Sequence, residues 1–321
     1  MTTKKIQHLP NQFGFRNPEA EKFPQMVVCG MSFVCNARCI HCPNAATNFS
    51  ATLKGSDRIM SREVFTAVAD ECAKYPHCLV RLSSAGEILM HPNALELIKY
   101  LLAVKTDKNV ALTTNGALLT PDKSEQLLKA GIRSIEISVD AADKETYEVI
   151  RVGLDYETLL NNVIELVRIR NEGNYSTRIM VSVIEQDLNR SFLTQIHEFW
   201  DKIADVVLVR KLLGFGGLVD RPNAATPYMP TDTPCPFLWE RVLIDPAGNV
   251  RGCVNDITGK GILGNILTQS LAEIWKSPLL NTWRGQHLVG NRQDVPLCEN
   301  CVDLEYRSWE YNYFHALNKE I

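Results

Sequence analysis

From residue 25 onward, short runs of apolar residues alternate with longer stretches in which apolar positions recur every three or four residues. The short runs are typical of strands buried on both faces of a parallel sheet, whereas the longer stretches have the period of a helix. The runs predict six strands, at residues 26–29, 79–82, 110–113, 134–138, 178–183 and 206–209. The helical periods predict five helices, at residues 61–74, 93–104, 121–130, 156–171 and 191–201.

Strands and helices that alternate along the chain predict an α/β fold with one parallel sheet. Six strands are too few to close an eight-stranded barrel. We therefore expect a partial, TIM-like (β/α)6 barrel. Ligands of such sheets bind at the carboxyl ends of the strands, so side chains at or just beyond those ends are the candidate site residues.

The pattern divides the chain into three parts. Residues 1–24 are polar and contain prolines, and we expect an N-terminal extension that lies on the surface. Residues 25–225 hold the barrel, and the stretch rich in Gly, Pro and Thr at 214–234 is typical of a linker or loop. Residues 226–321 form a smaller domain. Within it the pattern predicts a β-hairpin and two helices, at residues 239–253, 271–277 and 279–287.

The composition of the 321 residues is that of a soluble globular protein, with 45% hydrophobic and 22% charged residues. A net charge of −3 gives no general affinity for nucleic acid or for an anionic membrane, so we expect neither partner. The N-terminus lacks the apolar core of a signal peptide, and no run of about 18 apolar residues occurs. We therefore expect a cytoplasmic protein, in which ten grouped cysteines more often bind metal than form disulfides.

The first cysteine group, Cys35, Cys39 and Cys42, has CX3CX2C spacing and follows the first predicted strand. Three thiolates on one loop can hold three irons of a cubane cluster and leave the fourth iron open to a small chelating ligand. A zinc site with His41 as the fourth ligand is the alternative, but His41 is adjacent to Cys42, which is a poor geometry for joint chelation. The spacing favours the iron–sulfur cluster.

This group resembles the CX3CXΦC motif of the radical S-adenosylmethionine (SAM) superfamily, with His41 at the Φ position. The resemblance implies a catalytic [4Fe–4S] cluster on Cys35, Cys39 and Cys42. It further implies that the open iron binds SAM, and that reductive cleavage of SAM gives a 5′-deoxyadenosyl radical that takes hydrogen from the substrate. His41 is then expected to lie against the adenine.

Further elements resemble the superfamily in the same order along the chain. Gly86 and Glu87, after the second strand, resemble the motif that meets the SAM amino group, and a carboxylate is a fitting partner for an ammonium. Asn115 is expected near the ribose, and Arg151 is expected to pair with the SAM carboxylate. The implied SAM-binding residues are His41, Gly86, Glu87, Asn115, Ser138, Arg151 and Ser182. The usual Gly-Gly-Glu-Pro reads Ala-Gly-Glu-Ile here, which keeps Gly86 and Glu87.

The second cysteine group consists of Cys235, Cys253 and the CxxC pair Cys298 and Cys301. Four thiolates would saturate a [4Fe–4S] cluster, which would then transfer electrons and not bind SAM. A zinc site is the alternative, since spaced cysteines and CxxC pairs are common in zinc ribbons. We favour the cluster, because a radical enzyme has a use for a second redox centre.

The residues around these cysteines resemble the auxiliary-cluster modules called SPASM and twitch. A full SPASM module holds two auxiliary clusters. No cysteine follows Cys301, so at most one auxiliary cluster is fully ligated, as in the twitch type. The layout most resembles that of the 2-deoxy-scyllo-inosamine dehydrogenases, which oxidise an aminocyclitol hydroxyl, but it does not identify the substrate.

The resemblance implies a radical SAM oxidoreductase that oxidises a hydroxyl of a small polar substrate, such as an aminocyclitol or amino sugar. The auxiliary cluster is the expected electron acceptor, and a flavodoxin- or ferredoxin-type protein is the expected reductant. One alternative is a peptide-modifying enzyme that forms a crosslink or an epimer, although residues 1–24 are few for a peptide-binding domain. Others are a redox-neutral epimerase or deoxygenase and a non-catalytic metal-binding protein.

The remaining candidates have weaker patterns. Cys29, Cys72 and Cys78 stand apart from both groups and are expected to be small core residues, with a thiol that donates hydrogen to a substrate radical as the alternative. Arg210 and Lys211 end the sixth strand, where they could hold a carboxylate or phosphate of the substrate, with a solvated strand end as the alternative.

Overall fold

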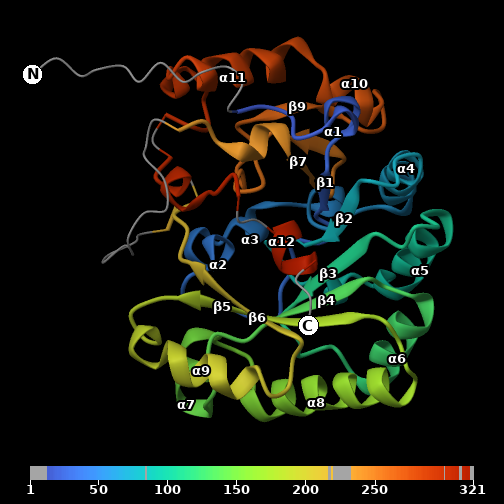
Figure 1. Ribbon diagram of the computed structural model, residues 1–321, viewed down its shortest axis with the longest axis vertical. Coiled ribbons are helices and arrows are strands. Elements are labelled where there is room, and N and C mark those ends of the chain that lie inside the picture. Colours follow the sequence, from blue (N-terminus) through green and yellow to red (C-terminus); the bar gives the residue numbers. More distant parts are fainter. Residues whose placement is uncertain are drawn as a thin grey trace, which may run out of the picture.

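A curved nine-stranded sheet forms the centre of this computed structural model, which describes residues 13–83, 85–215, 218–219, 233–299, 301–310 and 313–318 (Figure 1). In chain order the strands are β1 (Met26–Cys29), β2 (Leu79–Leu82), β3 (Val110–Thr114), β4 (Ser134–Ser138), β5 (Arg178–Glu185), β6 (Val206–Lys211), β7 (Arg241–Ile244), β8 (Asn249–Arg251) and β9 (Ile262–Asn265). Their order in the sheet is β6-β5-β4-β3-β2-β1-β7-β8-β9, and β1 to β7 are parallel. The six predicted strands are confirmed, as is the partial barrel with a small C-terminal domain.

Five helices connect the barrel strands and cover the outer face of the sheet (Figure 1). They are α4 (Arg62–Ala73), α5 (Ala94–Val104), α6 (Pro121–Ala130), α8 (Tyr156–Glu172) and α9 (Leu193–Trp200). The other α-helices are α1 (Pro18–Lys22), α2 (Pro43–Thr47), α3 (Phe49–Thr52), α7 (Lys144–Ile150), α10 (Leu271–Trp275), α11 (Pro278–Leu288) and α12 (Tyr313–Asn318). Short 3-10 helices are η1 (Gly55–Asp57), η2 (Ile88–Met90), η3 (Arg190–Phe192), η4 (Pro236–Trp239), η5 (Arg292–Asp294) and η6 (Asp303–Tyr306). Within the described ranges, no helix combines the length and apolar character that a bilayer span requires.

Side-chain caps fix the starts of several of these helices. The Ser61 hydroxyl accepts a hydrogen bond from the Val64 backbone N–H at 3.2 Å, and Asp155 accepts one from Thr158 at 2.7 Å. Such caps pair backbone N–H groups that have no partner inside the helix. At the end of α6, Gly131 adopts a left-handed conformation with φ of 81°, which stops the helix without the steric cost of a Cβ.

Strand β7 extends the barrel sheet, which the sequence pattern did not predict. We expected residues 239–253 to form a hairpin within a separate small domain. The hairpin of β7 and β8 is present, but β7 also pairs in parallel with β1, with Val27 opposite Val242. This pairing satisfies backbone groups that β1 would otherwise leave free at the sheet edge. The barrel and the C-terminal domain therefore share one sheet, and the boundary expected at residue 225 lies outside the described residues.

The C-terminal helix α12 packs into the concave face of the sheet (Figure 1). Its residues Tyr313, Ala316 and Leu317 are buried in an apolar cluster with strand residues that face the same side. Those strand residues are Met26, Val28, Leu79, Ala111, Met180, Val206, Leu208 and Leu243. Arg178 donates hydrogen bonds to the carbonyls of Ala316 and Leu317 at 3.1 and 3.0 Å, which pairs acceptors that the helix end leaves free. Helix α12 thus fills the barrel interior near the amino ends of the strands.

Part of the N-terminal extension is packed against the domain. We expected residues 1–24 to lie on the surface. Residues 1–12 are outside the described residues, but Ala20 and Phe23 are buried. Trp275 of α10 donates a hydrogen bond to the Ala20 carbonyl at 2.9 Å. Residues 16–19, 21 and 22 are exposed, so the described segment lies along the surface while its few apolar side chains gain free energy by leaving water.

Candidate active site

A cavity of about 320 Å³ lies at the carboxyl ends of the barrel strands, where ligands of such sheets bind. The first cysteine group and every residue singled out for SAM line this cavity. These ten residues are Cys35, Cys39, His41, Cys42, Gly86, Glu87, Asn115, Ser138, Arg151 and Ser182. The fold therefore brings together side chains that are far apart in the sequence.

Cys35, Cys39 and Cys42 lie on the loop between β1 and α2. N–H donors approach two of the sulfur atoms: the Ala37 backbone nitrogen lies 3.4 Å from Cys35 Sγ, and Arg151 Nη1 lies 3.8 Å from Cys39 Sγ. Burial raises the pKa of the Cys35 thiol to about 11. Because such donors stabilise negative charge on sulfur, the surroundings of these cysteines fit thiolates that hold an iron–sulfur cluster.

Gly86 packs so closely against the cysteine loop that no side chain fits. A Cβ at this position would lie 2.4 Å from the Ser32 carbonyl oxygen and 2.6 Å from that of Val34. The next residue, Glu87, donates its backbone N–H to the Val34 carbonyl at 2.8 Å. The glycine thus lets the loop after β2 approach the backbone that leads into Cys35.

The Glu87 carboxylate is hydrogen bonded to the protein around it. Its Oε1 accepts bonds from the Leu89 N–H at 3.0 Å and the Thr114 hydroxyl at 2.8 Å, and its Oε2 accepts one from the Asn115 N–H at 2.7 Å. Burial raises the pKa of this carboxyl, although these bonds oppose the shift. Glu87 therefore holds the loop after β2 against the end of β3. Its contact with the SAM amino group stays a prediction.

Asn115 connects the end of β3 to the cysteine loop. Its Nδ2 donates a hydrogen bond to Asn36 Oδ1 at 2.8 Å and lies 4.0 Å from Cys35 Sγ. Its Oδ1 accepts a bond from the Ala117 N–H at 3.0 Å. The side chain is thus fixed at the cavity wall, where the expected contact with the ribose stays a prediction.

The guanidinium of Arg151 is paired with Asp140, a residue that the sequence analysis did not select. Asp140 Oδ2 lies 2.8 Å from Arg151 Nε and 2.7 Å from Nη2, and both side chains are buried. Burial disfavours a charged guanidinium, but Asp140 outweighs it and raises the pKa of Arg151 above its usual value. We predicted that Arg151 pairs with the SAM carboxylate. In the structure its guanidinium contacts Asp140 and Cys39, and the pairing with SAM stays a prediction.

His41 lies buried beside Gln186 and Asp140. Its Nδ1 is 3.4 Å from Gln186 Nε2, and its Nε2 is 3.7 Å from Asp140 Oδ2. Burial lowers the pKa of His41 to about 4, so the imidazole is neutral at neutral pH. Gln186 directly follows β5 and Asp140 is the second residue after β4. This position at the carboxyl end of a strand is the signal by which sequence reasoning could have found them. A neutral ring in the cavity wall suits the expected contact with adenine.

Ser138 and Ser182 lie opposite each other on the neighbouring strands β4 and β5. Both line the cavity, and Ser182 is buried. A hydroxyl can both donate and accept hydrogen bonds, which fits a nucleoside, whose polar atoms include donors and acceptors. Their role in binding SAM stays a prediction.

The four cysteines of the second group come from separate segments. Cys235 precedes η4, Cys253 follows β8, and Cys298 and Cys301 lie between η5 and η6. Burial raises the pKa of Cys298 and the other three thiols raise it further, so the four lie within electrostatic reach of one another. Among the described residues, no three His, Cys, Asp or Glu side chains converge on one point as ligands of a single metal ion do. The fold thus gathers the four cysteines in one region, and their joint ligand role stays a prediction.

Both cysteine groups share a local backbone arrangement. At Cys35, Cys235 and Cys253, the N–H group two residues later is hydrogen bonded to the sulfur. At Cys253 the donor is the Asn255 backbone, 3.4 Å from Sγ. Hydrogen bonds to sulfur tune the potential of iron–sulfur clusters. These N–H groups favour charged sulfur, but burial outweighs them and raises the pKa of the Cys235 thiol to about 11 and that of Cys253 to about 12.

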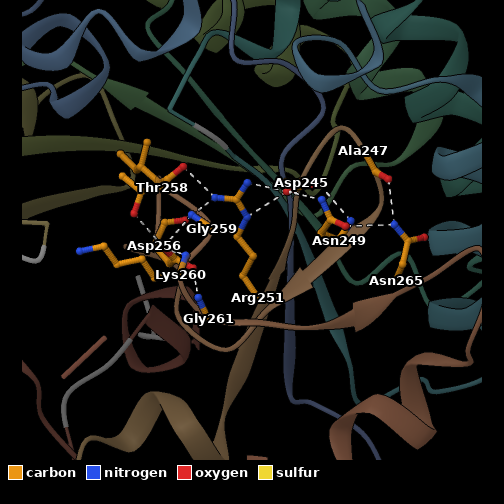
Figure 2. Close-up of polar contacts among 11 residues, drawn as sticks. Asp245, Ala247, Asn249, Arg251, Asp256, Thr258, Gly259, Lys260, Gly261 and Asn265 are labelled. Atoms are coloured by element: carbon orange, nitrogen blue, oxygen red, sulfur yellow. Dashed lines mark hydrogen bonds and ion pairs between the residues drawn. The ribbon is translucent and has the colours of Figure 1, made fainter. Parts of the chain in front are cut away.

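A network of buried polar residues holds the loop around Cys253 (Figure 2). Arg251 donates hydrogen bonds to Asp245 Oδ2 at 2.9 Å and to the Asp256 carbonyl at 2.6 Å. The Asp256 carboxylate in turn accepts the backbone N–H groups of residues 259–261. Because Arg251 and Asp256 flank Cys253 in the sequence, the network fixes the position of this cysteine.

Asp303 connects the second cysteine group to the cavity. Its carboxylate accepts hydrogen bonds from the backbone N–H groups of Gly214 at 2.6 Å and Phe215 at 2.9 Å, and from the Asn255 side chain at 3.0 Å. Phe215 and Asn255 both line the cavity, and Asp303 follows Cys301 by two residues. Part of the cavity wall is therefore built by residues that adjoin the second group.

The sequence matches two known domain models. Residues 31–187 match the radical SAM superfamily, and residues 235–302 match an iron–sulfur cluster-binding domain, SPASM. The first kind of domain holds a SAM-binding [4Fe–4S] cluster, and the second holds auxiliary iron–sulfur clusters. The two matched segments contain all seven cysteines of the two groups.

Individual relatives share parts of the sequence and the fold. The AdoMet-dependent heme synthase of Methanosarcina barkeri (strain Fusaro / DSM 804) is 31% identical over 128 residues, which are 40% of this chain and 34% of that protein. The antilisterial bacteriocin subtilosin biosynthesis protein AlbA of Bacillus subtilis (strain 168) is 25% identical over 331 residues, covering 88% of this chain and 68% of that protein. The chain thus spans about a third of the length of the first of these relatives. The structure of BtrN in complex with AdoMet and 2-DOIA has the same fold, with a TM-score of 0.59 and 18% identity over 90% of this chain and 98% of that one.

Proposed function

Because the chain is a radical SAM iron–sulfur enzyme with a SPASM domain after its barrel, we propose that it oxidises a hydroxyl group of a small polar substrate, such as an aminocyclitol or amino sugar. When bound, the first cluster and SAM supply a 5′-deoxyadenosyl radical, which removes a hydrogen atom from a substrate carbon. The substrate then loses one electron to the auxiliary cluster and one proton, so the product is two hydrogens lighter.

The observation that supports this proposal is that one cavity adjoins both cysteine groups. Cys35, Cys39 and Cys42 line the cavity, and so do Val254 and Asn255, which directly follow Cys253 in the chain. A substrate in this cavity would be near the proposed radical source and near the proposed electron acceptor. Electron transfer would then require no large movement of the protein.

Each residue has a proposed role. The proposed ligands of the SAM-binding cluster are Cys35, Cys39 and Cys42, and those of the auxiliary cluster are Cys235, Cys253, Cys298 and Cys301. The proposed SAM contacts are His41, Gly86, Glu87, Asn115, Ser138, Arg151 and Ser182. A flavodoxin- or ferredoxin-type protein is the proposed reductant of the first cluster.

A peptide-modifying enzyme is the second candidate. The observation that favours it is the likeness to subtilosin biosynthesis protein AlbA, which extends over 88% of this chain. The molecule that is consumed separates the candidates, because a crosslink in a peptide also removes two hydrogens. Loss of two hydrogens from a small molecule supports hydroxyl oxidation, whereas turnover of a peptide, with that mass change for a crosslink or none for an epimer, supports the second candidate.

The first test is anaerobic reconstitution, followed by measurement of iron and sulfide and of dithionite-driven 5′-deoxyadenosine formation. We expect about eight irons per chain and SAM cleavage, because the seven cysteines of the two groups would hold two cubane clusters. In Cys235→Ala we expect about four irons, with SAM cleavage retained. Cys78→Ala is the matched control, since Cys78 is a buried cysteine outside both groups, and it should keep about eight irons.

Other outcomes would contradict parts of the proposal. About four irons in the wild-type protein, with SAM cleavage, would mean that the second group holds zinc or no metal and is not the electron acceptor. Neither iron nor 5′-deoxyadenosine after controlled reconstitution would favour the non-catalytic metal-binding protein. Turnover that yields a product of unchanged mass would favour a redox-neutral reaction.

A further inference from the structure

Three arginines and one glutamate line the cavity in addition to the residues singled out for SAM. They are Arg81 on β2, Glu136 on β4, Arg210 on β6 and Arg241 on β7. Arg81 lies within β2 and Arg241 is the first residue of β7, whereas the cysteine loop and Gly86 lie beyond the strand ends. Arg81, Glu136 and Arg241 therefore begin deeper in the barrel than the cysteine loop and Gly86, whereas Arg210 lies opposite Ile184, nearer the strand ends.

Glu136 is shared between two of the arginines. Its Oε2 accepts hydrogen bonds from Arg81 Nη2 at 3.0 Å and from Arg210 Nη2 at 2.9 Å, and its side chain is buried. Burial acts to raise the pKa of Glu136, but Arg210 and Arg81 outweigh it and hold the pKa below its usual value. The carboxylate is thus charged at neutral pH and compensates only one of its two cationic partners.

Arg241 adds a third cationic group. It forms an ion pair with Glu240 through one terminal nitrogen, and its Nε has no hydrogen-bond partner among the described residues. The side chain is 7% exposed, and its charge and that of Arg81 repel each other. The four cavity residues and Glu240 thus contain three guanidinium groups and two carboxylates, an excess of one positive charge. An anionic ligand in the cavity would compensate this excess beside the buried Arg241, where an unpaired charge is costly.

We propose that Arg81, Arg210 and Arg241 bind an anionic group of the substrate, a carboxylate or a phosphate, on the floor of the cavity. The inference rests on the proposed function and narrows its substrate class to small polar molecules that carry such a group. Arg210 is the most accessible of the three, with 35% of its side chain exposed, and it reaches the floor from the edge strand β6. Guanidinium groups suit this task because their planar donors match the two oxygens of a carboxylate or phosphate.

Arg210 and Lys211, the two candidate anion-binding residues at the end of the sixth strand, have different surroundings in the structure. Arg210 lines the cavity, whereas Lys211 does not line it and forms an ion pair with Glu185 at 2.6 Å. Lys211 is therefore a matched control: it is a cation on the same strand, one residue away, that faces another carboxylate.

The test measures the affinity of the reconstituted, SAM-bound protein for inorganic phosphate and for malonate by calorimetry. We expect saturable binding of at least one probe in the wild type, weakened by about tenfold or more in Arg210→Gln and Arg81→Gln, because each loses a charge-assisted hydrogen-bond donor. In Lys211→Gln the affinity should stay within about twofold of the wild type. Stronger binding of phosphate would indicate a phosphorylated substrate, and stronger binding of malonate a carboxylate.

Three results would overturn the inference: no saturable binding of either probe, equal weakening in Lys211→Gln, or a parallel loss of SAM affinity, which would assign the arginines to SAM. Arg210→Lys keeps the positive charge but loses the planar arrangement of donors. It serves as a second variant in case Arg210→Gln does not fold, and its affinity for phosphate or malonate should lie between those of the wild type and Arg210→Gln. Anion binding does not depend on turnover. Loss of SAM cleavage in a protein that still binds phosphate would therefore count against the proposed function and not against this site.

Discussion

At the scale of single residues, Asp140 shows how one carboxylate can organise the candidate site. Its two oxygens contact Arg151 and the Ile184 N–H, and its φ of 56° places it in the left-handed region. Arg151 in turn lies against Cys39 Sγ. Asp140 therefore links the ends of β4 and β5 to the cysteine loop through a fully buried charge.

The first residue-scale prediction concerns this ion pair. Asp140→Asn keeps the shape of the side chain and tolerates the left-handed backbone, but it leaves the Arg151 guanidinium buried without its counter-charge. We expect the free energy of unfolding of the cluster-free protein in urea to fall by about 3–5 kcal/mol. Glu165→Gln is the control, because Glu165 pairs with Arg168 on the exposed surface of α8 and should change stability by less than about 0.5 kcal/mol. A loss in Asp140→Asn as small as that of the control would show that the buried pair does not stabilise the fold.

At the scale of elements, the apolar runs and the helix-start residues located the barrel strands and its five connecting helices to within a few residues. These signals are local: a buried parallel strand needs a short apolar run, and α4 begins at its cap, Ser61. The pairing of β7 with β1 was not predictable in this way, because it joins segments about 215 residues apart and depends on the register of Val27 with Val242. Helix α12, from Tyr313 to Asn318, is too short to show a helical period.

In the candidate site, too, features that are local in the sequence were predictable and long-range contacts were not. The spacing of the cysteines, the resemblance to the radical SAM superfamily and the strand ends together predicted ten residues that line the cavity. The partners of those residues, such as Asp140 and Gln186, depend on side-chain orientation in the folded protein. The same holds for Arg81 and Arg241, which lie inside strands and carry no motif.

An element-scale prediction concerns the contact between the loop after β2 and the cysteine loop. Gly86→Ala would place a Cβ within 2.4–2.6 Å of backbone atoms that cannot rotate away, so one loop must shift. We expect a loss of about 1–3 kcal/mol in the free energy of unfolding, and weaker binding of SAM by the reconstituted protein.

Gly285→Ala is the matched control for this contact. Gly285 lies inside α11, and nothing lies within 4 Å of the position that its Cβ would take. Alanine there should raise the free energy of unfolding by about 0.5–1 kcal/mol and leave SAM binding unchanged, because a helix interior favours alanine over glycine. If Gly86→Ala behaved like Gly285→Ala, the loop contact would not position the site.

At the scale of the whole molecule, the two parts of the chain form one unit around the cavity. The sheet runs without interruption from the barrel into the C-terminal hairpin, and Asp303 binds the backbone after β6 as well as Asn255. Helix α12, from the far end of the sequence, closes the barrel interior beneath Arg81, whose guanidinium lies 4.5 Å from the centre of the Tyr313 ring. The floor of the cavity and the anion site proposed on it therefore depend on the C-terminal helix.

The prediction at this scale is that α12 is part of the folded core. Leu317 is 5% exposed among the inner strand residues, so Leu317→Ala should lower the free energy of unfolding by about 2–4 kcal/mol, through lost apolar burial and the cavity left behind. His315→Ala, on the exposed side of the same helix, should change it by less than about 0.5 kcal/mol. Because α12 supports the floor and not the cysteine loop, Leu317→Ala should weaken phosphate or malonate binding more than SAM binding. Equal stability of the two variants in urea would mean that α12 does not form part of the core in solution, and the support proposed for Arg81 would be lost with it.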